Sequence, residues 1–133
     1  MLITALVAFV LFVGGSLLAG ADFLLWVLPG GLPLGNLLMP SGMLAAAAIP
    51  LLVKPGGRRF RAAAWFGVAL AAVWLPLGIA LAGNPELDFI NRPAGSLAFH
   101  SYTVATMAVI LGMLLVTFFL TVRTAMELSE FDE

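Results

Sequence analysis

The chain of 133 residues contains no cysteine, and only 10% of its residues carry a formal charge. The lack of cysteine excludes disulfides, thiolate metal sites and cysteine nucleophiles. Seven acidic and six basic residues nearly balance, so the net charge of −1 gives no indication of nucleic-acid binding. A single histidine also excludes a haem iron held by two histidines of the same chain.

Catalytic motifs are missing too. The sequence has no glycine-rich phosphate loop, no HExxH zinc motif and no nucleophile elbow. Paired carboxylates occur only at Glu86 and Asp88 and in the acidic C-terminal tail, where we expect water to solvate them. We therefore expect no catalytic activity of the chain's own. No cofactor is evident, and a lipid or a quinone is the ligand that the composition leaves open.

Hydrophobic residues are what the chain has in abundance. They make up 62% of the sequence, and the mean hydropathy is +1.12. Such values are typical of a multi-pass membrane protein and not of a soluble globular domain. The sequence therefore predicts one integral membrane domain over residues 1–133, with the bacterial inner (plasma) membrane as its location.

Four apolar runs predict an all-α membrane protein with four transmembrane helices, since a span needs roughly 20 apolar residues. The first run resembles a signal peptide around Ala19-Gly20-Ala21, but no Lys or Arg precedes it, which favours a retained helix. Pro40 and Pro50 interrupt the second run, so a kinked helix and a re-entrant segment are both open there. The expected helices cover about 2–28, 34–53, 62–83 and 97–123, followed by a short acidic tail.

Basic residues gather in one short loop, which holds four of the six in the chain. By the positive-inside rule this loop is cytoplasmic. Both termini are then cytoplasmic as well, and the loops at 29–36 and 84–96 face outward. The same cations are also candidates for binding anionic lipid headgroups. The four residues are Lys54, Arg58, Arg59 and Arg61.

Small residues recur at helical spacing on three of the expected helices. Such faces let helix backbones approach closely in lipid. The last helix also carries a threonine stripe on a different face, which favours either packing with hydroxyls bonded to the preceding turn or a polar path for a solute. The small residues are Gly15 and Ala19, then Gly67 and Ala71, then Ala105, Ala108 and Gly112.

Three ionisable residues fall on the expected outer side. Because a partly buried carboxylate is costly without a partner, we expect Asp22 to approach Arg92 or His100. The alternative is that each group reaches solvent separately. His100 lies about one turn from the boundary of its helix, as either an interfacial residue or a contact for quinone, haem or metal.

These features together predict a non-catalytic structural or accessory subunit of a larger membrane protein complex, with an energy-converting complex as one candidate. A homo-oligomeric small transporter or channel is the first alternative. A membrane anchor subunit that contacts quinone or haem is the second. The expected partners are other membrane protein subunits and lipids, without nucleic acid.

Overall fold

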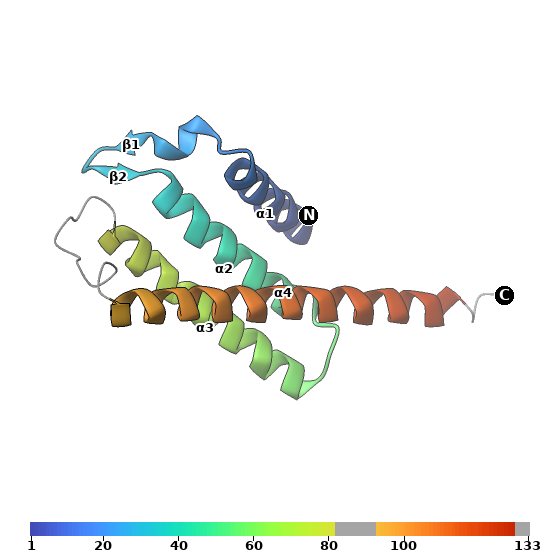
Figure 1. The fold of residues 1–133 in the computed structure, drawn as a ribbon. Helices are drawn as coiled ribbons and strands as arrows, with labels where there is room; N and C mark the ends of the chain where they lie inside the picture. The colour runs from blue at the N-terminus through green and yellow to red at the C-terminus, as the bar shows by residue number, and fades with distance from the viewer. Residues whose placement is uncertain (82–92, 130–133) are drawn as a thin grey trace.

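A computed structural model of the chain describes residues 1–81 and 93–129 and shows an all-α fold (Figure 1). The described chain has four α-helices: α1 (Leu2–Leu18), α2 (Gly35–Val53), α3 (Arg58–Leu81) and α4 (Pro93–Ser129). Helices α2, α3 and α4 are long and apolar enough to cross a membrane, whereas α1 has 17 residues. The chain is therefore an integral membrane protein with several spanning helices, as the sequence predicts.

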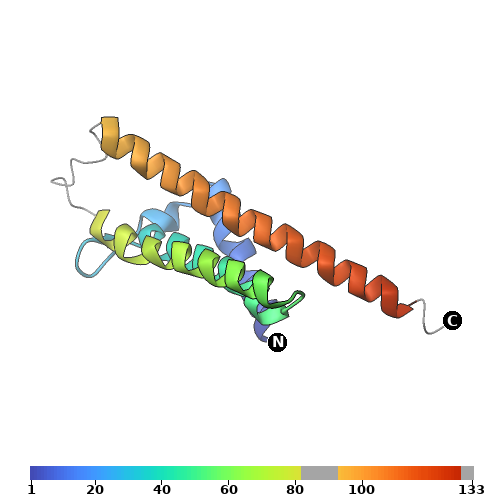
Figure 2. The same ribbon diagram turned by 90° about the horizontal axis from the view of Figure 1, so that it is seen from below.

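Helix α2 lies at the centre of the fold, in contact with α1, α3 and α4 (Figures 1 and 2). Its small side chains explain why three neighbours fit around it, since Ala45, Ala46 and Ala47 are all buried. A Cβ added at Gly42 would come within 2.9 Å of Val13 Cγ1 on α1. The proline-containing run is one continuous helix of 19 residues, long and apolar enough to cross a membrane.

The first helix is shorter than the predicted range 2–28, because the predicted C-terminal end was wrong. Helix α1 stops at Leu18 because Gly20 adopts a left-handed φ of +62°. The Gly20 N–H donates to Leu17 O and the Ala21 N–H donates to Ser16 O, which is a Schellman ending. Glycine takes this backbone conformation without the steric cost of a Cβ.

The segment between α1 and α2 forms a 3₁₀ helix, Asp22–Leu25, and a small antiparallel hairpin. Strands β1 (Val27–Leu28) and β2 (Leu32–Pro33) pair with Leu28 opposite Leu32. Gly30 and Gly31 turn the chain with φ values of +99° and +84°. Trp26, which directly precedes this hairpin, is largely exposed. Tryptophan is common at the membrane–water interface.

Helices α3 and α4 differ from their expected ranges at the ends. Helix α3 begins at Arg58, before the expected start at 62, and is described as far as Leu81; the expected end at 83 lies outside the described residues. Helix α4 has 37 residues, extending beyond the expected 97–123 in both directions. Proline suits the first turn of a helix, which is consistent with a start at Pro93. At the other end Arg123 and Glu127 form an i,i+4 ion pair of 2.7 Å that stabilises the last turns.

Helices α2 and α3 approach each other closely at Gly78. The side-chain amide of Asn36 donates to Gly78 O at 3.0 Å. A Cβ at Gly78 would lie only 2.7 Å from Asn36 O and 3.1 Å from Pro40 Cγ. Because Pro40 has no N–H, Asn36 O lacks its usual intrahelical donor, and the glycine backbone of α3 covers this carbonyl instead.

Helix α4 crosses α2 and α3 obliquely (Figures 1 and 2) and is held by an aromatic cluster. The ring of Trp74 on α3 stacks on Tyr102, with centroids 5.5 Å apart, and meets Phe99 edge-on at the same distance. Tyr102 Oη donates to Leu70 O at 2.6 Å. This cluster joins the main hydrophobic core, which includes Met43 and Ile110.

Candidate functional site

Two adjacent pockets lie along α2. The first, here called the methionine pocket, has a volume of about 240 Å³ between α1, α2 and α4. The second, the tryptophan pocket, has a volume of about 440 Å³ and is bounded by α2, α3 and α4, by the end of α1, and by the 3₁₀ helix and β2 of the segment that follows it. Leu17 and Met39 line both pockets. The pair therefore forms a candidate binding site that continues along the central helix.

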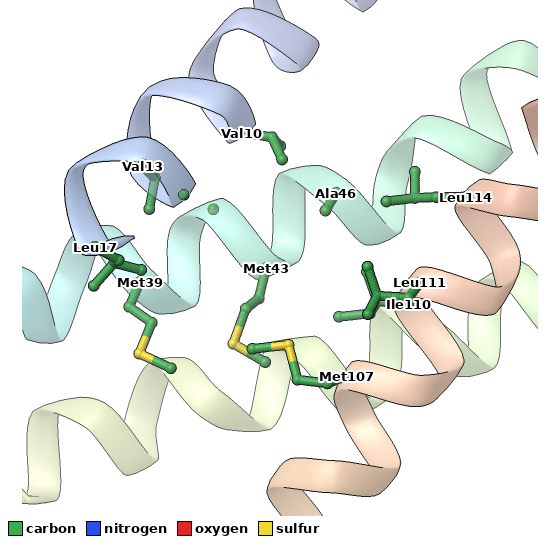
Figure 3. A pocket seen from close by; sticks show the side chains of 12 residues that line it. Val10, Val13, Leu17, Met39, Met43, Ala46, Met107, Ile110, Leu111 and Leu114 are labelled. Carbon is green, nitrogen blue, oxygen red and sulfur yellow. The ribbon is translucent and has the colours of Figure 1, made fainter. Parts of the chain in front are cut away.

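The methionine pocket has an almost wholly apolar wall. Figure 3 shows Met39 and Met43 of α2 together with Met107 of α4, all with side chains in the wall of the pocket. Ile110 closes one side and is buried in the main core. Methionine side chains are unbranched and polarizable, so they adapt to apolar molecules of different shapes. This pocket suits a flexible hydrocarbon chain.

The tryptophan pocket adds three side chains with hydrogen-bonding groups, Asn36, Trp74 and Thr103. Asn36 uses one amide hydrogen on Gly78 O, which leaves its second hydrogen and its Oδ1 without a partner among the described residues. Trp74 is only 5% exposed, and its buried Nε1 has no hydrogen-bond partner within the described chain. A buried indole N–H normally finds an acceptor, so this end of the site has unused donors.

The threonine stripe of α4 is occupied by contacts within the helix. Thr103, Thr106, Thr117, Thr121 and Thr124 each donate to the backbone carbonyl four residues earlier, at 2.7–2.9 Å. Thr106 and Thr117 are buried in the bundle. The hydroxyl hydrogens are therefore bonded to the preceding turn, which is the geometry that the packing alternative predicts.

The described residues show no ion pair between Asp22 and His100, and the expected approach of Asp22 to Arg92 stays a prediction. The carboxylate is exposed at the start of the 3₁₀ helix and makes no ion pair with another described residue. His100 is exposed on α4, where its Nδ1–H donates to Ser96 O at 2.7 Å. His100 lines neither of the two pockets. Arg92 lies outside the described residues.

The basic residues Lys54, Arg58, Arg59 and Arg61 are all exposed at the turn between α2 and α3. Lys54 ends α2 in a left-handed conformation, with φ of 51°, and its N–H donates to Pro50 O. Among the described residues none of the four forms an ion pair. Their charges are therefore available to solvent or to lipid headgroups.

The small-residue faces fall into two groups. Gly67 and Ala71 are buried in α3, and a Cβ at Gly67 would sit 3.5 Å from Val109 of α4. The other small residues are exposed: Gly15 and Ala19 on α1, and Ala105, Ala108 and Gly112 on α4. A Cβ added at Gly15 or Gly112 would meet nothing within 4 Å. The chain thus presents a bare small-residue face on α4, opposite the face that packs into the bundle.

Sequence reasoning missed the pocket at Asn36, Trp74 and Thr103. One signal was present, because Asn36 is a lone polar residue at the start of an apolar run and lies four residues before Pro40. Because Pro40 has no N–H, the backbone carbonyl of Asn36 lacks its helical donor, and the amide side chain of the same residue lies beside it. Trp74 could be identified as deep in its helix, but its neighbours on α4 depend on how the helices cross.

No family model, no curated protein and no solved structure matches this chain. Among the described residues, no group of three or more His, Cys, Asp or Glu side chains could hold a metal ion. Two features of the molecule therefore bear on function: the pair of pockets along α2 and the bare face of α4.

Proposed function

We propose that the chain is a non-catalytic accessory subunit that docks a transmembrane helix of a different membrane protein through α4. The observation that carries this proposal is the exposure of Ala105, Ala108 and Gly112 on a membrane helix whose opposite face is already buried. Small residues allow close backbone contact in lipid, where packing supplies most of the cohesion between helices. A bare face of this kind fits a helix better than it fits loose lipid chains.

The chemistry of the described residues supports a partner of a different kind over a second copy of the chain. No group of three or more His, Cys, Asp or Glu residues among them could hold a metal ion, and the buried Thr106 and Thr117 bond to their own helix. A homodimer would contain two copies of the same side chains and no additional kind of reactive group. A partner of a different kind could supply the reactive groups that these residues lack.

The proposed orientation has the turn Lys54–Arg61 and both termini in the cytoplasm, because short basic loops stay on that side. Helix α1 serves as the fourth span. Its 17 residues extend about 26 Å, which is near the lower limit for crossing a hydrocarbon core of roughly 30 Å. The hairpin between β1 and β2 then lies at the outer surface with Trp26 in the interfacial belt.

A matched pair of substitutions tests the docking face. Ala108 on α4 and Ala69 on α3 are both exposed, so leucine at either position makes the same chemical change. We expect Ala108→Leu to lower the yield of co-purifying membrane protein about tenfold, as overpacking of roughly 1–3 kcal/mol predicts. Ala69→Leu should leave that yield unchanged. Equal yields from both variants would show that the small face of α4 meets lipid.

A further inference from the structure

We propose that the methionine pocket and the tryptophan pocket together bind a neutral amphiphile of the membrane. Its uncharged head, bearing a carbonyl group, would occupy the tryptophan pocket, and an apolar chain of the same molecule would extend into the methionine pocket. This binding function is additional to docking through α4, because α4 turns a different face toward the pockets. Ile110 lines the methionine pocket, whereas Ala108 does not.

The length of the site matches one leaflet of a bilayer. Asn36 marks the first turn of α2 and Ala46 lines the far part of the methionine pocket. Ten residues of helix separate them, which is about 15 Å at 1.5 Å per residue. Half of a hydrocarbon core is also roughly 15 Å. A molecule with its head near the membrane boundary and its chain ending near the midplane fits this span.

The charge of the site selects the head group. Neither pocket is lined by an Asp, Glu, Lys, Arg or His residue of the described chain. A phosphate or an ammonium group would be desolvated there without a counter-charge, at high cost. The basic residues that suit a phosphate lie at the opposite end of α2. The head that fits the tryptophan pocket is therefore uncharged.

The unused hydrogen-bond donors select a carbonyl. The second amide hydrogen of Asn36 and the Nε1–H of Trp74 both lack an acceptor within the described chain. A ketone or ester oxygen accepts such hydrogen bonds and carries no charge. The Nε1 atom is buried, whereas Asn36 is half-buried, so Asn36 is the more accessible of the two donors.

The size and shape of the site favour this occupant over a partner's helix. Ligand pockets usually measure roughly 300–1,000 Å³, and the tryptophan pocket alone is about 440 Å³. A transmembrane helix is about 10–12 Å wide with its side chains and crosses both leaflets. The paired pockets are too small for such a helix and are confined to one end of α2.

Two membrane compounds share the required chemistry: a quinone, through its ring carbonyls, and a glycerolipid, through its ester carbonyls. Tryptophan fluorescence separates them. Trp26 and Trp65 are 67% and 63% exposed and line neither pocket, so Trp26→Phe with Trp65→Phe leaves Trp74 as the sole reporter. Trp26→Phe with Trp74→Phe leaves Trp65 as a matched control away from the site.

Both single-tryptophan proteins, delipidated in detergent, are titrated with decylubiquinone and separately with dioctanoylglycerol. Binding predicts a saturable change of Trp74 emission with at least one probe, and the effective probe identifies the head group. Trp65 should show only the linear response of a compound dissolved in the micelle. A linear response that is equal at Trp74 and Trp65 with both probes would overturn the proposal.

A second pair of variants tests the position of the head. Thr103 lines the tryptophan pocket, so Thr103→Phe fills that space, while Thr103→Val keeps the shape of the side chain. In the Trp74 reporter we expect Thr103→Phe to weaken the saturable response at least about tenfold and Thr103→Val to preserve it. An unchanged response in Thr103→Phe would place the binding outside the pocket and refute the assignment.

Discussion

Replacing Gly78 with alanine should destabilise the bundle, because α2 and α3 approach each other closely at this glycine. The added Cβ would lie 2.7 Å from Asn36 O and 3.1 Å from Pro40 Cγ. The first of these atoms belongs to backbone, so a side-chain rotation cannot relieve the clash. The two helices must separate, and the hydrogen bond from Asn36 to Gly78 O lengthens with them.

The size of the effect follows from three contributions. Overpacking costs about 1–3 kcal/mol, and a weakened hydrogen bond costs about 0.5–1.5 kcal/mol. Alanine is a better helix former than glycine by up to about 1 kcal/mol, which offsets part of the loss. We therefore expect Gly78→Ala to lower the free energy of unfolding by about 1–3 kcal/mol.

Gly67 on the same helix is the control. A Cβ there would sit 3.5 Å from Val109, which is ordinary van der Waals contact. Gly67→Ala should then be neutral or stabilising by up to about 1 kcal/mol. The assay is unfolding of the detergent-solubilised protein by increasing mole fraction of SDS, followed by circular dichroism. If the two variants unfold at the same SDS fraction, α2 and α3 do not approach at Gly78 as described.

Two other predictions concern the aromatic cluster and the orientation. Tyr102→Phe removes the donor to Leu70 O while keeping the ring on Trp74, so the same SDS titration should show a loss of about 0.5–1.5 kcal/mol; no loss would mean that the hydroxyl bonds to water instead. For the orientation, Val27→Cys should react with a membrane-impermeant maleimide in intact cells, and Gly57→Cys should react only after permeabilisation. The reverse labelling pattern would contradict the proposed topology.

Much of the fold could be predicted from hydropathy, because long apolar helices leave a strong signal. The ranges of α2 and α3 differ only modestly from expectation. The end of α1 was within reach as well, since Gly20 in Ala19-Gly20-Ala21 is a typical helix stop. The helix end was missed because the run stays apolar through Leu28, and hydropathy alone does not indicate which residue adopts a left-handed conformation.

The pockets could not be predicted, because they depend on which faces of the helices meet. The sequence shows that Trp74 is deep in its helix, but not that Phe99 and Tyr102 of α4 surround it. The central place of α2 was also hidden, since its prolines suggest irregularity. Only in three dimensions do Gly42 and the alanines after it explain how three helices pack around it.

The size and composition of the complex extracted from native membranes test the central claim most directly. The protein is solubilised in a mild detergent, isolated through an affinity tag and analysed by size-exclusion chromatography and mass spectrometry. We predict a particle larger than one 14.0 kDa chain with its bound detergent. This particle should contain at least one different membrane protein in fixed proportion. A stable monomer or homodimer without any other chain would contradict the proposed role as an accessory subunit.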